Sequence, residues 1–116
     1  MGLVQATYKK NCSEPYFSLI KNGKKTVEGR LFKDDVKNMK TGDLLIIVNP
    51  ETKEEIKCKI KDLTVSKSFE DLYDEFGTDL LPDTEGESKP WEIYYKFYKR
   101  VDEKEYGVIG IKIELV

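Results

Sequence analysis

The beginning of the chain places apolar residues at helical spacing. Tyr16, Leu19 and Ile20 recur as they would along one face of a helix. Residues 13–15, Ser-Glu-Pro, come directly before them and offer an N-cap followed by a proline in the first helical turn. Gly23 is a natural end for such a helix. The pattern therefore predicts a short helix that ends in a turn.

A strand is predicted directly after this turn. Over residues 25–31 apolar and polar side chains alternate, as expected for a half-buried strand, with Val27 and Leu31 on one side. The other side carries Thr26, Glu28 and Arg30. Glu28 and Arg30 stand two residues apart on this face, about 7 Å between their Cα atoms, so they can form an ion pair.

The middle of the chain predicts a β-hairpin. A turn at 41–43 leads into the continuous apolar run 44–48, which is typical of a strand covered on both sides. Residues 49–52, Asn-Pro-Glu-Thr, interrupt this run. From Ile56 to Val65 apolar residues then alternate with lysines, so the second strand has an exposed, basic side.

The last part of the chain predicts two helices and a closing strand. Ser68, with Asp71 three residues later, resembles a capping box that opens a helix over 69–76. A loop rich in proline, glycine and acidic residues follows over 78–90. Apolar alternation over 107–115 predicts the final strand.

Between that loop and that strand, an amphipathic helix with an aromatic stripe is predicted over 91–100. The stripe consists of Trp91, Tyr94, Tyr95 and Tyr98. Core packing is the stronger explanation for such a stripe. Tyr98, beside Lys99 and Arg100, is the member expected at the edge of a cleft.

Together these elements predict an α+β fold. Four or five strands with helices that do not alternate regularly favour a mixed, largely antiparallel sheet curled into a small β-barrel with peripheral helices. With 116 residues, 1–116 is expected to form a single domain. No apolar run is long enough to cross a membrane and residues 1–10 lack a signal sequence, so we expect a cytoplasmic protein without membrane contact.

Composition narrows the possible chemistry. The chain has no histidine, which excludes Ser-His-Asp and Cys-His catalysis. Cys12 and Cys58 are isolated, so free, partly buried thiols are expected, with neither a metal site nor a cofactor. The net charge of −2 argues against non-specific coating of polyanions, although the charge over 1–66 is positive and that over 67–116 is negative.

Several segments, in this order along the chain, resemble the ASCH domain family, which is a PUA-like family. They are GKKTVEGR at 23–30, KTGD at 40–43, FEDLYDEFG at 69–77, WEIYYKFY at 91–98 and YGVIGIKI at 106–113. The resemblance covers nearly the whole chain. It implies a small β-barrel with a cleft beside it, and a role in binding RNA or other nucleic acids.

The family pattern GxKxxExR is matched in full by Gly23, Lys25, Glu28 and Arg30. The resemblance therefore implies a charged cleft that binds RNA or a modified nucleoside. The candidate ligand-binding residues are Tyr16, Lys24, Lys25, Glu28, Arg30 and Tyr98. Arg30 offers a planar fork for a phosphate or a base edge, and Glu28 can orient it or accept a base N–H. A structural ion pair would explain these two residues equally simply, and Lys24 fits a solvated surface charge.

An enzyme is the alternative interpretation. Some members of the family hydrolyse the amide of acetylated cytidine and others have been described as ribonucleases, and the amidohydrolases carry a threonine where Glu28 stands. In this chain the catalytic candidates would be Lys25 as a base, Glu28 activating a water, and Glu85 as an acid from the 83–87 loop. Asp83 and Glu87 lie in the same loop.

A third interpretation is a protein-interaction domain, in which the acidic 83–87 loop and the aromatic helix contact a partner. A monomer is expected in each case.

Overall fold

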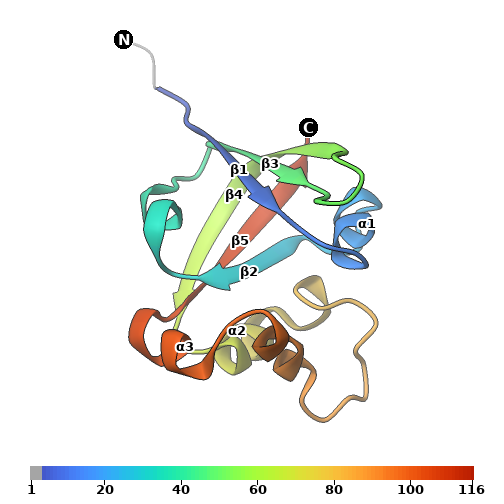
Figure 1. The fold of residues 1–116 in the computed structure, drawn as a ribbon, viewed down its shortest axis with the longest axis vertical. Helices are drawn as coiled ribbons and strands as arrows, with labels where there is room; N and C mark the ends of the chain where they lie inside the picture. The colour runs from blue at the N-terminus through green and yellow to red at the C-terminus, as the bar shows by residue number, and fades with distance from the viewer. Residues whose placement is uncertain (1–3) are drawn as a thin grey trace.

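The computed structural model describes residues 4–116, which form a curled five-stranded sheet with short helices around it (Figure 1). The elements, with 3₁₀ helices written η, are β1 (Thr7–Asn11), α1 (Tyr16–Lys21), β2 (Val27–Leu31), η1 (Asp34–Asn38), β3 (Leu44–Val48), β4 (Glu55–Ser66), α2 (Phe69–Phe76), η2 (Gly77–Asp79), η3 (Pro90–Lys96), α3 (Arg100–Tyr106) and β5 (Val108–Leu115). No helix within the described part of the chain is long and apolar enough to cross a membrane.

The strands follow the order β1-β3-β4-β5-β2, so β1 and β2 are the two edges of the sheet. β1 pairs parallel with β3, and the other three pairings are antiparallel. The sheet is therefore mixed, and it curls into a half-barrel that stays open between its two edges. The predicted α+β fold with a curled mixed sheet is confirmed, as is the β3–β4 hairpin.

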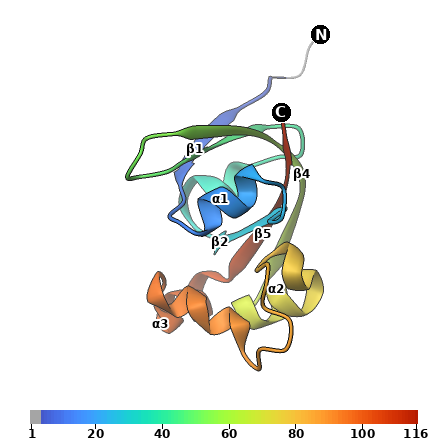
Figure 2. The ribbon, with the colours of Figure 1, turned by 90° about the vertical axis from the view of Figure 1, so that its right-hand side faces the viewer.

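Two clusters of buried side chains lie on opposite faces of β5. Ile109, Ile111 and Ile113 face the inside of the half-barrel, where Phe17 and Ile20 of α1 pack against them. α1 thus fills the concave side of the sheet (Figure 2). Val108 faces a second cluster formed with α2, the leucines after η2, and η3. The alternation of β5 explains this division, because successive side chains of a strand point to opposite faces.

Two glycines bring the helical layer close to the sheet. Gly29 of β2 and Gly110 of β5 are direct cross-strand partners. A Cβ atom on Gly29 would lie 2.8 Å from the hydroxyl oxygen of Tyr94, and one on Gly110 would lie 2.9 Å from Cδ1 of Leu72. If both strand positions carried residues with a Cβ atom, η3 and α2 would have to lie farther from the sheet.

The prediction for α2 is confirmed in detail. Ser68 is the N-cap, and its hydroxyl oxygen accepts a hydrogen bond from the backbone N–H of Asp71 at 3.1 Å. The helix ends at Gly77, which has a positive φ of 53°. For α1 the N-terminal prediction is wrong. Pro15 is the N-cap, and the Glu14 carboxylate, rather than Ser13, accepts the Ser18 N–H at 3.0 Å.

The continuous helix predicted over 91–100 is also wrong. The chain forms η3 up to Lys96 and then turns before α3 begins at Arg100. The four residues of the predicted aromatic stripe nevertheless all pack in the second cluster, as core packing predicts, whereas Phe97 does not. The spacing of apolar residues does not predict α3, because its buried residue is the charged Glu103. The Glu103 carboxylate accepts hydrogen bonds from the Phe69 N–H and from the Tyr95 hydroxyl.

β1 was not predicted at all. Its five residues are TYKKN and alternate between exposed and half-buried positions, so the segment carries almost no apolar signal. Pairing with the apolar strand β3 makes it a strand. Cys12, just after it, and Cys58 on β4 are buried free thiols, as expected from the sequence.

Candidate ligand-binding pocket

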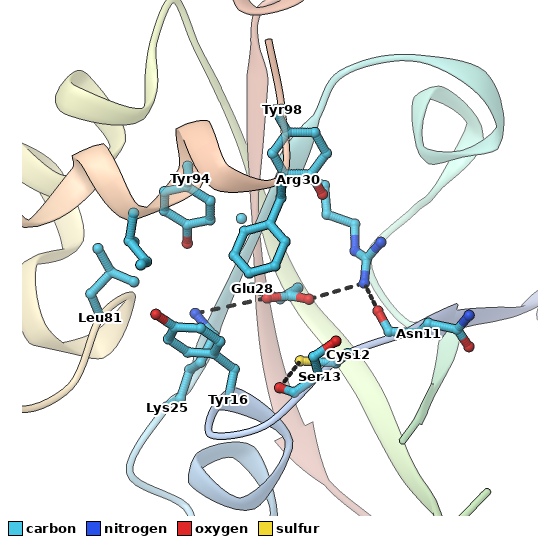
Figure 3. Close-up of a pocket in the computed structure, with 13 residues that line it drawn as sticks. Asn11, Cys12, Ser13, Tyr16, Lys25, Glu28, Arg30, Leu81, Tyr94 and Tyr98 are labelled. Carbon is cyan, nitrogen blue, oxygen red and sulfur yellow. Dashed lines mark hydrogen bonds and ion pairs between the residues drawn. The ribbon is translucent and has the colours of Figure 1, made fainter. Parts of the chain in front are cut away.

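A pocket of about 120 Å³ opens at the seam between the two edges of the half-barrel. Its walls come from the end of β1 and the chain after it, from α1, from the chain before β2 and the middle of β2, and from the helical layer (Figure 3). The lining residues are Asn11, Cys12, Ser13, Tyr16, Lys25, Glu28, Gly29, Arg30, Leu81, Ile93, Tyr94, Phe97 and Tyr98. The pocket is smaller than the roughly 300–1,000 Å³ of sites for drug-sized ligands, which suits a single small ring.

The register of β2 explains why its two charged residues point into the half-barrel. Glu28 pairs with Ile111 and Arg30 with Ile109, and both isoleucines belong to the inner core. Glu28 is only 6% exposed. Nη2 of Arg30 lies 3.1 Å from Oε2 of Glu28, so the predicted ion pair forms. The buried carboxylate therefore lies where the apolar core meets the pocket.

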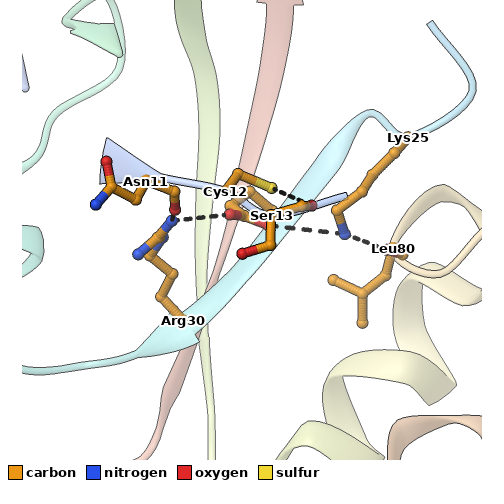
Figure 4. A network of polar contacts seen from close by, with 7 residues as sticks. Asn11, Cys12, Ser13, Lys25, Arg30 and Leu80 are labelled. Carbon is orange, nitrogen blue, oxygen red and sulfur yellow. Dashed lines mark hydrogen bonds and ion pairs between the residues drawn. The ribbon is translucent and has the colours of Figure 1, made fainter. Parts of the chain in front are cut away.

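Arg30 also connects the two edges of the sheet. The same Nη2 atom donates a hydrogen bond to the backbone carbonyl of Asn11, the last residue of β1 (Figure 4). Arg30 belongs to the other edge strand, β2. The guanidinium thus bridges the opening of the half-barrel beside the pocket.

Lys25 lies on the other side of Glu28 and is 2% exposed. Its Nζ is 3.8 Å from Oε1 of Glu28, donates a hydrogen bond to the Leu80 carbonyl, and lies 5.7 Å from the centre of the Tyr16 ring. Burial lowers the pKa of Lys25 below its ordinary value, and the negative charge of Glu28 opposes this shift. Lys25, Glu28 and Arg30 form a row with the carboxylate in the middle, which we call the charged row.

The pKa of Arg30 is raised. Burial is the largest single effect and disfavours the charged form, but Glu28, together with smaller contributions from Tyr98 and Cys12, outweighs that cost, so the guanidinium stays charged. Burial also raises the pKa of the Cys12 thiol to about 12. At neutral pH this thiol is therefore protonated and is a poor nucleophile.

Two buried polar atoms at the pocket lack a hydrogen-bond partner within residues 4–116. They are Nε of Arg30 and the hydroxyl oxygen of Tyr94. Tyr94 is 7% exposed and Arg30 is half-buried, and both line the pocket. Unpaired buried polar groups are costly, so both atoms are candidates for contact with a ligand or with ordered water.

The structure brings five of the predicted site residues together: Tyr16, Lys25, Glu28, Arg30 and Tyr98. The other two lie outside the pocket lining. Lys24 is exposed, as expected for a solvated surface charge, and Glu85 is exposed on the loop after η2.

The other acids of the 83–87 loop, and Thr26 of the predicted polar strand face, also lie outside the pocket lining. Asp83 and Glu87 do not line it, and Thr26 lines a separate hollow with Ile20 and Ile113. No three His, Cys, Asp or Glu side chains over 4–116 gather as a metal site would require.

Sequence reasoning missed two parts of this pocket. Asn11, Cys12 and Ser13 enter it only because β1 pairs with β3, and the sequence around them has no strand pattern. Phe97 was missed because it does not fall on the predicted aromatic stripe. Phe97 is 56% exposed, and the signal in the sequence was a phenylalanine between Lys96 and Lys99, off the apolar stripe of the predicted helix.

The fold and this pocket define a class of small α+β proteins in which a half-barrel, consistent with a PUA-like barrel, carries a charged pocket at its open seam. The family model of the ASCH domain matches residues 11–116. The chain therefore belongs to the ASCH domain family. A search of proteins with curated functions finds no match.

Solved structures share this fold. The crystal structure of hypothetical protein PH0355 is similar, with 33% identity and a TM-score of 0.84 over 95% of this chain and 99% of that one. The solution structure of protein PF0455 from Pyrococcus furiosus has 29% identity and a TM-score of 0.74, covering 95% and 97%. An ASCH domain from Lactobacillus crispatus shares the fold, with 14% identity, a TM-score of 0.61, and coverage of 96% and 80%.

Proposed function

We propose that this protein binds single-stranded RNA by placing one unpaired base in the pocket, without chemical turnover. The observation that carries the proposal is a small pocket with aromatic walls and the charged row at its floor. Recognition of single-stranded RNA commonly combines these two features, because splayed bases stack on aromatic rings and are read along their polar edges. The general link of ASCH domains to RNA supports the same interpretation.

The aromatic residues are suited to hold more than one base. Tyr16, Tyr94 and Tyr98 line the pocket, and a flat ring inside it would lie against them. Phe97 also lines the pocket but is largely exposed, so it can stack on a neighbouring base outside. Stacking on an aromatic side chain contributes about 1–3 kcal/mol per base and tolerates any sequence.

The RNA backbone can be held by cations near Phe97. Lys96 and Lys99 flank it along the chain and both are exposed. Such lysines contact phosphates and make binding dependent on salt, without adding base specificity. Within this proposal the charged row reads a base, and the surface lysines hold the backbone.

Hydrolysis by the same pocket has less support. Glu85 would have to move to the pocket to act as the acid, and the high pKa of Cys12 makes it a weak nucleophile at neutral pH. Lys25, whose pKa is lowered, is the one candidate base, but its Nζ contacts Glu28 and the Leu80 carbonyl.

The test is a titration of fluorescently labelled single-stranded RNA with the protein and with Phe97→Ala, at low salt. Because Phe97 is exposed, the variant should fold normally, and losing one stacked base should weaken binding by about 5- to 150-fold. Val101→Ala is the matched control, since Val101 is a 64% exposed residue outside the pocket lining. No binding by the unaltered protein would overturn the proposal, and equal affinity of all three proteins would show that no base stacks on Phe97.

Lys24→Ala and Arg30→Lys complete the experiment. Lys24 lies outside the pocket lining and should change affinity only as much as any single surface charge does. Arg30→Lys keeps the charge but loses the fork, so affinity should fall further. Release of product from RNA or from an acylated nucleoside would instead favour the enzyme. Capture of a protein that survives Arg30→Lys and Phe97→Ala would favour an interaction domain.

A further inference from the structure

The charged row has a fixed order of hydrogen-bonding character. Lys25 and Arg30 carry only donors, whereas an ionised carboxylate such as Glu28 only accepts. Figure 3 shows Glu28 between the other two, with the ion pairs on either side drawn as dashed lines. From one side of the pocket floor to the other, the protein therefore presents donor, acceptor and donor.

Each of the three groups keeps capacity for a further hydrogen bond. The Lys25 ammonium has three N–H donors and one close acceptor, the Leu80 carbonyl, with Glu28 3.8 Å away. The guanidinium has five N–H donors, of which Nε has no partner among the residues described. The carboxylate has about four acceptor positions, and its Oε2 accepts from Nη2 of Arg30.

We infer that the pocket selects uracil, the base whose reading edge presents acceptor, donor and acceptor. This inference rests on the proposed function and specifies the base. The imide of uracil has an N–H between two carbonyl groups. The N–H can donate to Glu28 while the two carbonyl oxygens accept from Lys25 and Arg30. The pattern is symmetric, so either orientation of the ring satisfies it.

The other three bases each place a mismatched group against the row. Cytosine directs the lone pair of its ring nitrogen N3 at the Glu28 carboxylate, where both groups are acceptors. Guanine matches at its carbonyl and its ring N–H, but its exocyclic amine then faces a cation, donor against donor. Adenine presents only an amine and a ring-nitrogen acceptor on this edge. A buried group that is left unpaired costs more than a lost contact, so such mismatches discriminate between ligands.

The two unpaired polar atoms of the pocket, one of them in the charged row and one outside it, favour the same type of ligand. Among residues 4–116 no acceptor pairs with Nε of Arg30, and the hydroxyl of Tyr94, on a side chain that is 7% exposed, can donate as well. Both atoms are covered in this structure, so a carbonyl oxygen of a ligand would accept from them only once neighbouring side chains shift. An anion such as phosphate would also satisfy donors, but it would have to approach the Glu28 carboxylate, which repels it.

The test compares uridine, cytidine and adenosine hexanucleotides with a uridine hexanucleotide methylated at N3. Methylation at N3 removes the single N–H that should donate to Glu28 and leaves the rest of the nucleotide unchanged. We expect oligouridylate to bind about 5- to 150-fold more tightly than the cytidine and N3-methylated forms, as for a specific edge contact. This comparison uses the unaltered protein and does not depend on how a variant folds.

Glu28→Gln supplies a second, opposite readout. A glutamine can present an N–H to the ring nitrogen of cytosine, so the preference should move from uridine towards cytidine. Tight binding of all the hexanucleotides with equal affinity would overturn the uracil inference and leave the RNA-binding proposal standing. Binding of none of them would overturn both. Equal affinity for uridine and its N3-methylated form would overturn the inference even if cytidine bound more weakly.

Discussion

Replacement of Glu28 by alanine should destabilise the fold by an amount that the burial of its neighbours determines. The carboxylate lies between Lys25, which is 2% exposed, and the half-buried Arg30. Removing one partner of a buried pair leaves an uncompensated charge and typically costs about 3–5 kcal/mol. The loss of stability has an upper limit, because Lys25 can release its proton and become neutral. Removing a proton at pH 7 from a group whose ordinary pKa is 10.5 costs about 5 kcal/mol. We therefore expect a loss of about 3–5 kcal/mol at pH 7.

The same variant should regain stability as the pH rises. Burial already lowers the pKa of Lys25, and removing the Glu28 charge, which raises it, lowers that pKa further. Between this lowered pKa and 10.5 the unfolded chain binds more protons than the folded one, so the free energy of unfolding increases with pH. The increase is at most about 1.4 kcal/mol per pH unit, and it should be larger in Glu28→Ala than in the unaltered protein.

Urea unfolding followed by the fluorescence of Trp91, at pH 7 and pH 9, measures both effects. Glu114→Ala is the matched control, because Glu114 is an exposed carboxylate 3.8 Å from Lys61 and should change stability by less than about 1 kcal/mol. A loss below about 1 kcal/mol in Glu28→Ala, or an equal loss at both pH values, would refute this reasoning.

Two further predictions concern packing and helix capping. Gly29→Ala would place a Cβ atom 2.8 Å from the Tyr94 hydroxyl oxygen and 3.3 Å from Cδ1 of Leu80, so it should lower stability by about 1–3 kcal/mol. Adding Tyr94→Phe removes that hydroxyl and should restore part of the lost stability. If the double variant were no more stable than Gly29→Ala alone, the steric cause would be contradicted. Ser68→Ala removes the hydrogen bond to the Asp71 N–H and should cost about 1 kcal/mol in urea unfolding. Ser68→Asp should keep the free energy of unfolding of the unaltered protein. An unchanged free energy of unfolding in Ser68→Ala would show that the cap contributes nothing.

Local signals in the sequence were sufficient for much of the fold. The hairpin of β3 and β4 follows from an apolar run, a turn and an alternating strand, all of which are short-range features. The start and end of α2 follow from the capping serine and the terminal glycine. The same holds for the shared face of Glu28 and Arg30, because strand alternation requires only that β2 be a strand.

Other features depended on contacts between distant segments. β1 is a strand because β3 offers it an edge, and its own residues carry little apolar pattern. α3 turns Glu103 inwards, where backbone and tyrosine donors satisfy a carboxylate that periodicity would assign to the surface. The chain leaves η3 at Lys96 and turns before α3, and Phe97 of this turn lines the pocket.

The sequence by itself determined the elements with strong local patterns, the family resemblance, and the alternation that puts Glu28 and Arg30 on one face. Only the tertiary structure decided that Lys25 is buried beside them, that Arg30 reaches the end of β1, and that Glu85 does not line the pocket. The physical reason is that alternation and capping act within a few residues. The burial of Lys25 and the hydrogen bond from Arg30 to the end of β1 instead depend on segments that only the folded sheet brings together.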